Sequence, residues 1–175
     1  GVVVQDAYRI MPWADALYGC DDRWWHIHQD CAGFKGEKWS PHEPLGNDKL
    51  AVADKYGVRL VEGVHGSQFS VDGGKIAYGA NSGFQGLNLA LLKGCTRIVL
   101  VGFNMRKVNG QKHFFGDHPK GLYNREEFES FVTHFAAGAK SLPKDVKIVN
   151  ATPGSALTFF KMMDLETALA ANVRG

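Results

Sequence analysis

Residues 97–103, which read Arg-Ile-Val-Leu-Val-Gly-Phe, constrain the fold more than any other segment of the chain. The run is apolar after its first residue, and apolar and polar positions do not alternate along it. A strand with one face in water alternates, whereas a strand covered on both faces does not. The segment therefore predicts a strand of a parallel sheet that is buried on both faces.

Extended and helical patterns alternate along the rest of the chain. Further strands are expected at 2–5, 16–18, 58–61 and 146–149, and helices after Asp21, from Asn81 to Gly94, and over 47–56, 124–142 and 164–171. The segments 33–46, 63–79 and 104–122 are rich in Gly and polar residues and are expected to be loops. This alternation predicts an α/β fold, a Rossmann-like, mostly parallel sheet with helices on both faces. A chain of 175 residues is most simply one domain, spanning residues 1–175.

Composition excludes several classes of protein. Lys and Arg number 20 against 18 Asp and Glu, and no basic run stands out, so duplex nucleic acid is not an expected partner. No apolar stretch approaches the roughly 18 residues of a membrane helix, and the first residues lack the pattern of a signal peptide. The three cysteines are an odd number without regular spacing and do not suggest a disulfide framework. A cytoplasmic protein without a membrane partner is expected, and a homo-oligomer is left open.

Polar clusters follow four of the predicted strands, where a parallel sheet binds its ligands. Gln5, Asp6 and Tyr8 follow the first strand and Asp21 follows the second, while the other clusters lie at 104–118 and 150–155. Asp21 is a candidate contact to a ribose or a base. Its alternative role is the N-cap of the helix that begins next to it.

The turn Asn81-Ser82-Gly83 opens the clearest helix of the chain. Free backbone amides and the positive end of a helix suit a phosphate or a carboxylate, and Gly83 lets a ligand approach the backbone. The alternative is an ordinary N-cap followed by a glycine needed for packing. Gln85 and Asn88 lie early on the same helix and either support a ligand or lie on the surface.

The loop after residue 103 carries two histidines, His113 and His118, with Asp117 between them. A histidine titrates near pH ~6.5 and so suits a general acid or base. A zinc site needs about four ligands, and the local set is incomplete. His118 is favoured as a functional residue, whereas His113 is equally well explained as a residue at the edge of the core beside Phe114 and Phe115.

A second group of potential metal ligands lies earlier in the chain, at Cys20, His26, His28 and Cys31. On a helix His28 and Cys31 share a face, but His26 and His28 point apart. Aromatic packing by the tryptophans at 24 and 25 explains this segment better than a metal site does. The chain has no complete dinucleotide-binding, phosphate-loop or nucleophile-elbow motif.

Several segments together resemble a known family. They read VVVQDAYRIMPWADALYGCDDRWW, GANSGFQGLNLALLKGCTRIVLVGFNM, HFFGDHP and VNATPGSAL. They resemble proteins of tailed phages and prophages in the sialyltransferase-like, pterin diphosphokinase-like group, whose fold is Rossmann-type. A remoter resemblance extends to the bacterial sialyltransferases that use a cytidine-monophosphate sugar.

The resemblance implies roles for individual residues. The 81–83 turn would face the nucleotide, and Gln5 stands where these relatives often carry a ligand-facing Asn. His118 resembles the catalytic-base histidine of the sialyltransferases, in which the spacing is one residue shorter.

The resemblance also concerns three later positions. Asn104 stands where family members commonly carry an Asp after the Gly-Phe pair, and Asn150 and Ser155 would close the nucleotide side of the site. Family members usually begin with an additional strand and a Gly-Pro-Ser loop that cradles phosphates. The resemblance implies that the sequence starts after this strand, and its absence would be expected to expose a sheet edge and remove part of the phosphate site.

These observations together predict a phage-type, glycosyltransferase-like protein that binds a nucleotide or nucleotide-sugar and needs no metal and no further cofactor. His118 would deprotonate an acceptor hydroxyl. The expected nucleotide-binding residues are Gln5, Asp6, Tyr8, Asp21, Asn81, Ser82, Gly83, Gln85, Asn104, His113, Asn150 and Ser155. The alternatives are a nucleotide-binding protein that sequesters a signal without turnover, and a phage structural or assembly protein that keeps only the fold.

Overall fold

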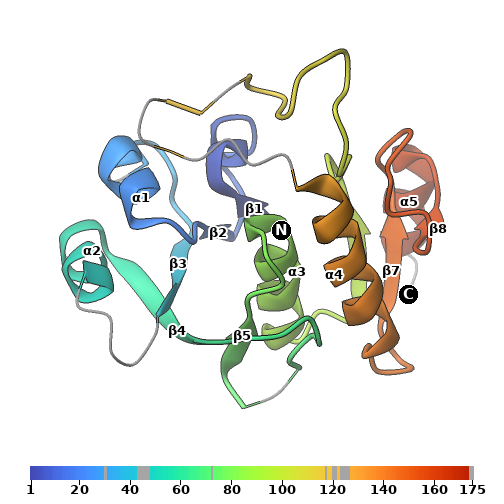
Figure 1. Cartoon of the computed structure of the whole chain (residues 1–175), viewed down its shortest axis with the longest axis horizontal. Coiled ribbons are helices and arrows are strands. Elements are labelled where there is room, and N and C mark those ends of the chain that lie inside the picture. The colour runs from blue at the N-terminus through green and yellow to red at the C-terminus, as the bar shows by residue number, and fades with distance from the viewer. Residues whose placement is uncertain are drawn as a thin grey trace.

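The computed structural model describes residues 1–29, 31–42, 48–71, 73–116, 118–119, 122 and 127–173. In these residues five helices and one 3-10 helix, η1, are interspersed with eight strands (Figure 1). The strands are β1 (Val2–Val4), β2 (Ala16–Tyr18), β3 (Glu37–His42), β4 (Val58–Val64), β5 (Lys75–Ala77), β6 (Arg97–Leu100), β7 (Lys147–Asn150) and β8 (Lys161–Met162). The helices are η1 (Gln5–Arg9), α1 (Asp22–His28), α2 (Asp48–Tyr56), α3 (Ser82–Leu92), α4 (Phe128–Lys140) and α5 (Leu165–Val173).

The strands form two parallel sheets, which confirms the predicted α/β class. The larger sheet has the order β1-β2-β3-β4-β5, and the smaller has the order β6-β7-β8. Every pair of named strands is parallel. In the described part of the chain β1 pairs with β2 alone, so β1 is an edge strand of the larger sheet.

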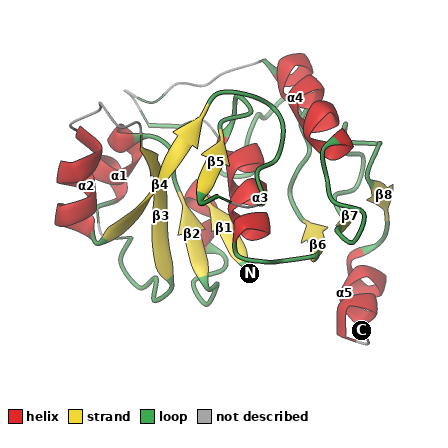
Figure 2. Cartoon of the chain, turned by 90° about the horizontal axis from the view of Figure 1, so that it is seen from below, coloured by secondary structure: helices red, strands yellow, loops and turns green. Residues whose placement is uncertain are grey.

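Helices cover both faces of the larger sheet, as Figure 2 shows. On one face α1 and α2 bury Trp24, Trp25 and Val52 against β1, β2 and β4. On the other face α3 packs Leu89 against Tyr18 of β2 and residues of β4 and β5. Both tryptophans are completely buried, which supports packing as the role of this aromatic pair.

The helix α3 also connects the two sheets. Phe84, Leu87 and Leu91 pack against Leu100 of β6 and residues of β7 and α4, on the side of α3 that faces the smaller sheet. Residues 84–91 are all buried, because one side of the helix contacts each sheet. The start of α3 is therefore held at the end of both sheets, where the predicted ligand site lies.

Two segments expected to be loops contain strands. β3 lies inside 33–46, and β5 and the end of β4 lie inside 63–79. The sequence did not predict these strands because the segments contain many turn-forming residues. They are extended because neighbouring strands pair with them. Pro41, for example, stands opposite Val61 in the β3–β4 register.

The strongest predicted strand is shorter than expected and less buried. β6 ends at Leu100, and Gly102 then turns the chain with a positive φ of 80°. Only Leu100 of β6 is buried, and Val101 is 54% exposed, so the expectation of complete burial on both faces was wrong. The physical reason is that β6 is the terminal strand of a three-stranded sheet and pairs with β7 alone in the described residues.

Helix boundaries agree with the predicted capping residues where these are described. Asp21 caps α1 and Asn81 caps α3 through side-chain oxygens. The predicted caps Asn47 and Asn124 lie outside the described residues. No helix in the described ranges is both long enough and apolar enough to cross a membrane.

Candidate functional site

The carboxyl ends of β1 and β2 meet the start of α3. β1 leads directly into η1, which carries Gln5, Asp6 and Tyr8. β2 leads to Cys20, whose Sγ lies 2.8 Å from the Ser82 Oγ at the first turn of α3. This contact joins segments that are 62 residues apart in sequence. The structure thus places the turn that opens α3 beside the residues that follow β1 and β2, where two of the predicted polar clusters lie.

The turn that opens α3 is an N-cap, as its alternative role required. The Asn81 Oδ1 accepts a hydrogen bond of 2.9 Å from the Phe84 backbone amide. A Cβ placed on Gly83 would lie 3.3 Å from the ring of Phe103, so the glycine allows the segment after β6 to approach the helix. The backbone before the turn is unusual, because Ala80 has a φ of +66°. Capping does not use the Nδ2 of Asn81, which is buried without a hydrogen-bond partner.

The backbone at the end of β1 is also in a sparsely populated conformation. Gln5 has a φ of +47°, which a non-glycine residue adopts at a cost of about 1 kcal/mol or more. Met105, in the loop after β6, has a φ of +48°. Gln5, Ala80 and Met105, three of the six described non-glycine residues with positive φ, therefore lie within five residues of a strand end. Such residues cluster at binding sites, because the surrounding structure must hold the chain in place.

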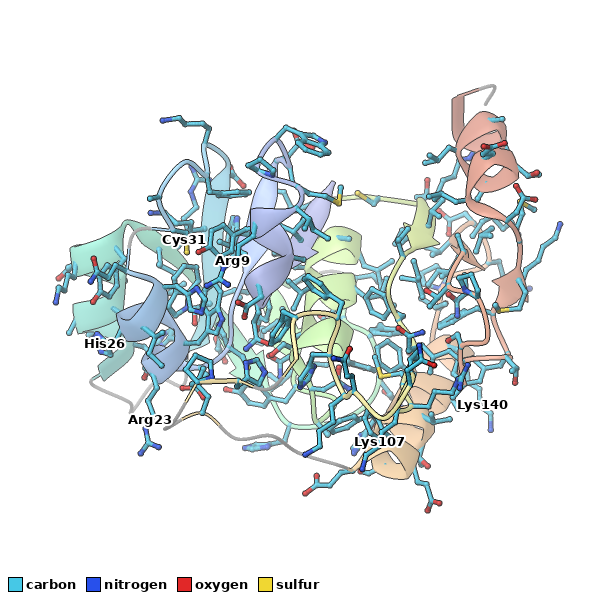
Figure 3. The ribbon with its side chains drawn as sticks, turned by 90° about the horizontal axis from the view of Figure 1, so that it is seen from above. Arg9, Arg23, His26, Cys31, Lys107 and Lys140 are labelled. Atoms are coloured by element: carbon cyan, nitrogen blue, oxygen red, sulfur yellow. The ribbon has the colours of Figure 1, made fainter. Side chains whose placement is uncertain are left out.

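A buried polar cluster connects η1 with α1. The Asp6 carboxylate accepts a 3.0 Å hydrogen bond from the Trp24 indole and lies 3.6 Å from His28. The His28 ring stacks on Trp24 with centroids 4.3 Å apart, and its Nδ1 lies 3.2 Å from the Tyr8 hydroxyl. Arg9 also belongs to this cluster, and it lies beside Cys31 (Figure 3). Sequence reasoning did not assign His28 to the ligand site, because only the fold places it next to Asp6 and Tyr8.

The histidine-bearing loop after β6 reaches the same cluster. The rings of His113 and Phe115 are parallel, with centroids 5.0 Å apart, and the His118 ring centroid lies 4.6 Å from that of His113. Burial is the largest cause that lowers the pKa of His28, and charge on His118 lowers it further. This interaction places His118 within electrostatic reach of His28. Asp117 lies outside the described residues.

Other predicted site residues use their polar atoms within the fold. Gln85 accepts from the Tyr18 hydroxyl at 2.8 Å and donates to the Tyr78 carbonyl oxygen. Asn150 accepts from the Thr152 amide, and the Ser155 hydroxyl donates to the Phe103 carbonyl oxygen and accepts from the Leu157 amide. These bonds shape the turns on which they lie.

Two further predicted residues lie at strand ends with backbone or capping roles. Asp21 Oδ1 accepts from the Arg23 amide at 2.8 Å and so caps α1. Asn104 follows β6, and its carbonyl oxygen accepts from the Ala156 amide at 2.9 Å. The Asn104 side chain is a neutral amide, so this position carries no charge.

Lys49 was not predicted as a site residue, and it lies in the first turn of α2. Its amine donates to the Cys20 carbonyl oxygen and the Ser40 hydroxyl of β3, and forms an ion pair of 2.6 Å with the Asp22 carboxylate. These contacts hold the start of α2 against β3 and the start of α1. Nothing in the local sequence around Lys49 indicates this role, because its partners come from two other segments, 20–22 and β3.

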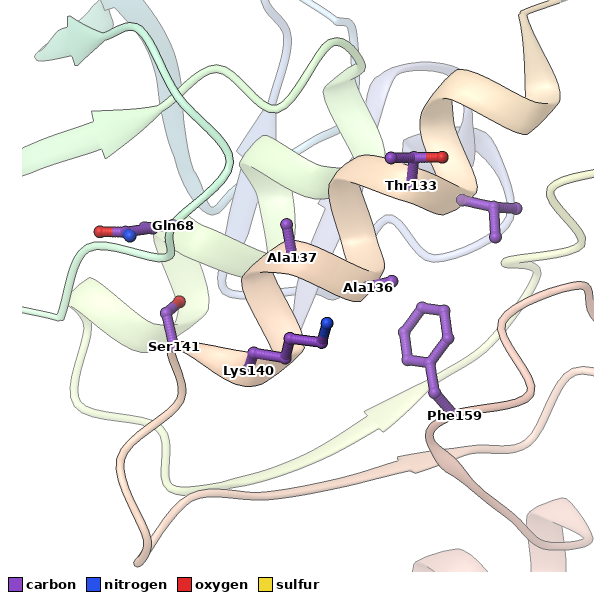
Figure 4. Close-up of a pocket in the computed structure, with 8 residues that line it drawn as sticks. Gln68, Thr133, Ala136, Ala137, Lys140, Ser141 and Phe159 are labelled. Atoms are coloured by element: carbon purple, nitrogen blue, oxygen red, sulfur yellow. The ribbon is translucent and has the colours of Figure 1, made fainter.

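A groove of about 590 Å³ lies apart from these residues, along α4 (Figure 4). Its lining consists of Gln68, Val132, Thr133, Ala136, Ala137, Lys140, Ser141 and Phe159. None of the predicted site residues lines it, and its one ionisable group is the amine of Lys140. Among the described residues, no three His, Cys, Asp or Glu side chains are grouped to hold a metal ion.

Comparison of the chain with protein-family models, with curated proteins and with solved structures found no match.

Proposed function

We propose that this protein binds a nucleotide or nucleotide-sugar at the carboxyl ends of β1 and β2 and the start of α3. One observation carries the proposal: the Cys20–Ser82 contact brings the N-terminus of α3 to the end of a parallel sheet. A helix N-terminus at that place favours a phosphate group, because its amides and its dipole both attract an anion. The polar side chains of η1 directly follow β1, whose last residue, Val4, lies against Gly86 of α3.

The proposed activity is transfer of the sugar to an acceptor hydroxyl, as in a phage-type glycosyltransferase. His118 takes the proton of the acceptor hydroxyl as its oxygen bonds to the sugar carbon. The bond between that carbon and the nucleotide phosphate breaks, and its electron pair leaves with the phosphate. The scheme needs no metal and no further cofactor, and it is compatible with a cytoplasmic protein.

Binding is tested by thermal shift with nucleoside mono- and diphosphates and with nucleotide-sugars. A ligand present at 100 times its dissociation constant adds about 2.7 kcal/mol to the free energy of unfolding. Replacing Asn81 and Ser82 together by Ala should remove the shift while leaving the protein folded. Asp164→Ala is the matched control, because it removes a similar cap from α5. Absence of a shift with every compound at millimolar concentration would contradict the proposal.

Transfer is separated from binding by His118→Ala. A general base contributes about 10²–10⁴-fold to the rate, and it acts on the acceptor rather than on the bound nucleotide. The variant should therefore lose turnover and keep nucleotide affinity. A wild-type protein that binds a nucleotide-sugar tightly but neither hydrolyses nor transfers it would favour the alternative role of a sequestering protein.

A further inference from the structure

In the Asp6–His28–Tyr8 cluster, the groups on either side of the His28 ring determine which of them donate hydrogen bonds and which accept. Asp6 lies on one side, and Tyr8 and Arg9 lie on the other. The His28 side chain is 3% exposed. Its Nε2 has no hydrogen-bond partner and lies 3.6 Å from the Asp6 Oδ1, whereas its Nδ1 faces the Tyr8 hydroxyl at 3.2 Å and the Arg9 guanidinium at 3.5 Å. The two ring nitrogens therefore face groups of opposite kind.

Those groups decide which nitrogen of His28 carries the proton. The Asp6 carboxylate only accepts hydrogen bonds, and its other oxygen already accepts from the Trp24 indole. A lone pair on Nε2 would face this anion, whereas an N–H there is attracted to it. Arg9 can only donate, so the Nδ1 that it faces must carry the lone pair. Both neighbours favour the tautomer with its proton on Nε2.

The His28 ring is neutral at pH 7, so only one of its two nitrogens carries a proton. Burial lowers the pKa of His28, and the charges of Arg9 and His118 lower it further, against the opposing effect of Asp6. With Nδ1 as acceptor, the Tyr8 hydroxyl, which is the nearer of its two donors, donates its proton inward to His28. The Arg9 guanidinium donates to the Tyr8 oxygen, so a single lone pair of that oxygen remains for a ligand.

We propose that Tyr8 accepts a hydrogen bond from a ribose hydroxyl of the ligand. The inference rests on the proposed function, which it deepens by naming the part of the ligand bound at η1. The Arg9 side chain is 57% exposed and Tyr8 is half-buried, so both can be reached from solvent. Asp6 and His28 are positioning residues, because they act by fixing the direction of the Tyr8 proton.

The first experiment measures the tautomer in the ligand-free protein. Long-range ¹H–¹⁵N spectra of histidine-labelled protein at pH 7 distinguish an Nε2 proton from an Nδ1 proton, and His28→Gln assigns the resonance. The expected result is a neutral ring with its proton on Nε2. A proton on Nδ1, or a doubly protonated ring, would overturn the inference whatever the protein binds.

The second experiment measures affinity, with the His28 resonance as the readout. The probes are ribose 5-phosphate and the four nucleoside 5′-monophosphates, each with its 2-deoxy and 3-deoxy forms. One neutral hydrogen bond corresponds to about a 3- to 10-fold preference for the ribose over one of its deoxy forms. Tyr8→Phe should reduce that preference to less than twofold.

Tyr56→Phe is the matched control. The Tyr56 hydroxyl lies 3.0 Å from the Nδ1 of His26, so it forms a similar tyrosine–histidine pair between α2 and α1. Its removal should leave the preference for ribose unchanged. Equal loss in both variants would show that the effect of Tyr8→Phe is not local.

The outcomes separate the inference from the proposed function. Nucleotide binding without a preference for ribose overturns the inference and leaves the proposed function intact. Binding of ribose 5-phosphate with the preference, while no nucleotide binds, supports the inference and contradicts the proposed function. Failure of every probe to bind overturns both.

Discussion

Asn88 provides the most direct test of how α3 is held against the larger sheet. Its side chain is completely buried and makes three hydrogen bonds to backbone. Its Oδ1 accepts from the amides of Ala77, at 2.9 Å, and Ser70, at 3.2 Å, and its Nδ2 donates to the Ser70 carbonyl oxygen. Replacement by Ala removes all three bonds and leaves the buried Ala77 amide without this acceptor.

The magnitude follows from those contacts. A buried amide that loses its partner costs about 1–3 kcal/mol, and each of the other two bonds contributes about 0.5–1.5 kcal/mol. Asn88→Ala should therefore lower the free energy of unfolding by about 2–6 kcal/mol, or the melting temperature by roughly 5–20 °C for a chain of this size. Asn81→Ala loses a single bond at a half-buried cap and should cost only about 1 kcal/mol.

Urea unfolding of both variants measures the difference. The slope of the free energy against urea concentration should stay constant, so that the change in midpoint reports stability. A loss below about 1 kcal/mol for Asn88→Ala, at unchanged slope, would refute the argument that these bonds hold α3 to β5.

Three further predictions concern the same part of the molecule. Gly86→Ala should lower the melting temperature by a few degrees, because the added Cβ overlaps the Val4 side chain. Adding Val4→Ala to this variant should restore the melting temperature. An unchanged melting temperature in Gly86→Ala alone would contradict the close approach of α3 to β1. Because the pKa of His28 is lowered on folding, the unfolded chain binds more protons just below pH ~6.5, so the free energy of unfolding falls as the pH decreases from there. His28→Gln should lose less stability than the wild type between pH 7 and pH 5, as measured by urea midpoints, and an equal loss would count against this assignment. Asp21→Ala should cost about 1 kcal/mol through loss of the α1 cap, and an unchanged nucleotide affinity in calorimetry would exclude its alternative role as a ribose or base contact.

Local signals in the sequence predicted the elements that depend on neighbouring residues. The alternating segments predicted the α/β class, and the short polar side chains of Asp21 and Asn81 predicted two helix starts. An N-cap contacts an amide two or three residues away, so the sequence contains both partners. The strands β3 and β5 were not predicted, because their extended form depends on pairing with β2 and β4 rather than on their own residues.

The candidate site likewise combines features that the sequence predicts with features that depend on the tertiary structure. The sequence by itself determined that Gln5, Asp6 and Tyr8 follow a strand and that Ser82 opens a helix, since these are relations along the chain. Only the tertiary structure decided that Asn88 is a buried anchor rather than a ligand contact, and that His28 lies between Asp6 and Tyr8. Such contacts join residues 11 or more positions apart, and the packing of α1 and α3 on opposite faces of one sheet creates them. The physical reason is that a side chain's partners across the core depend on how whole elements pack, which no local pattern contains.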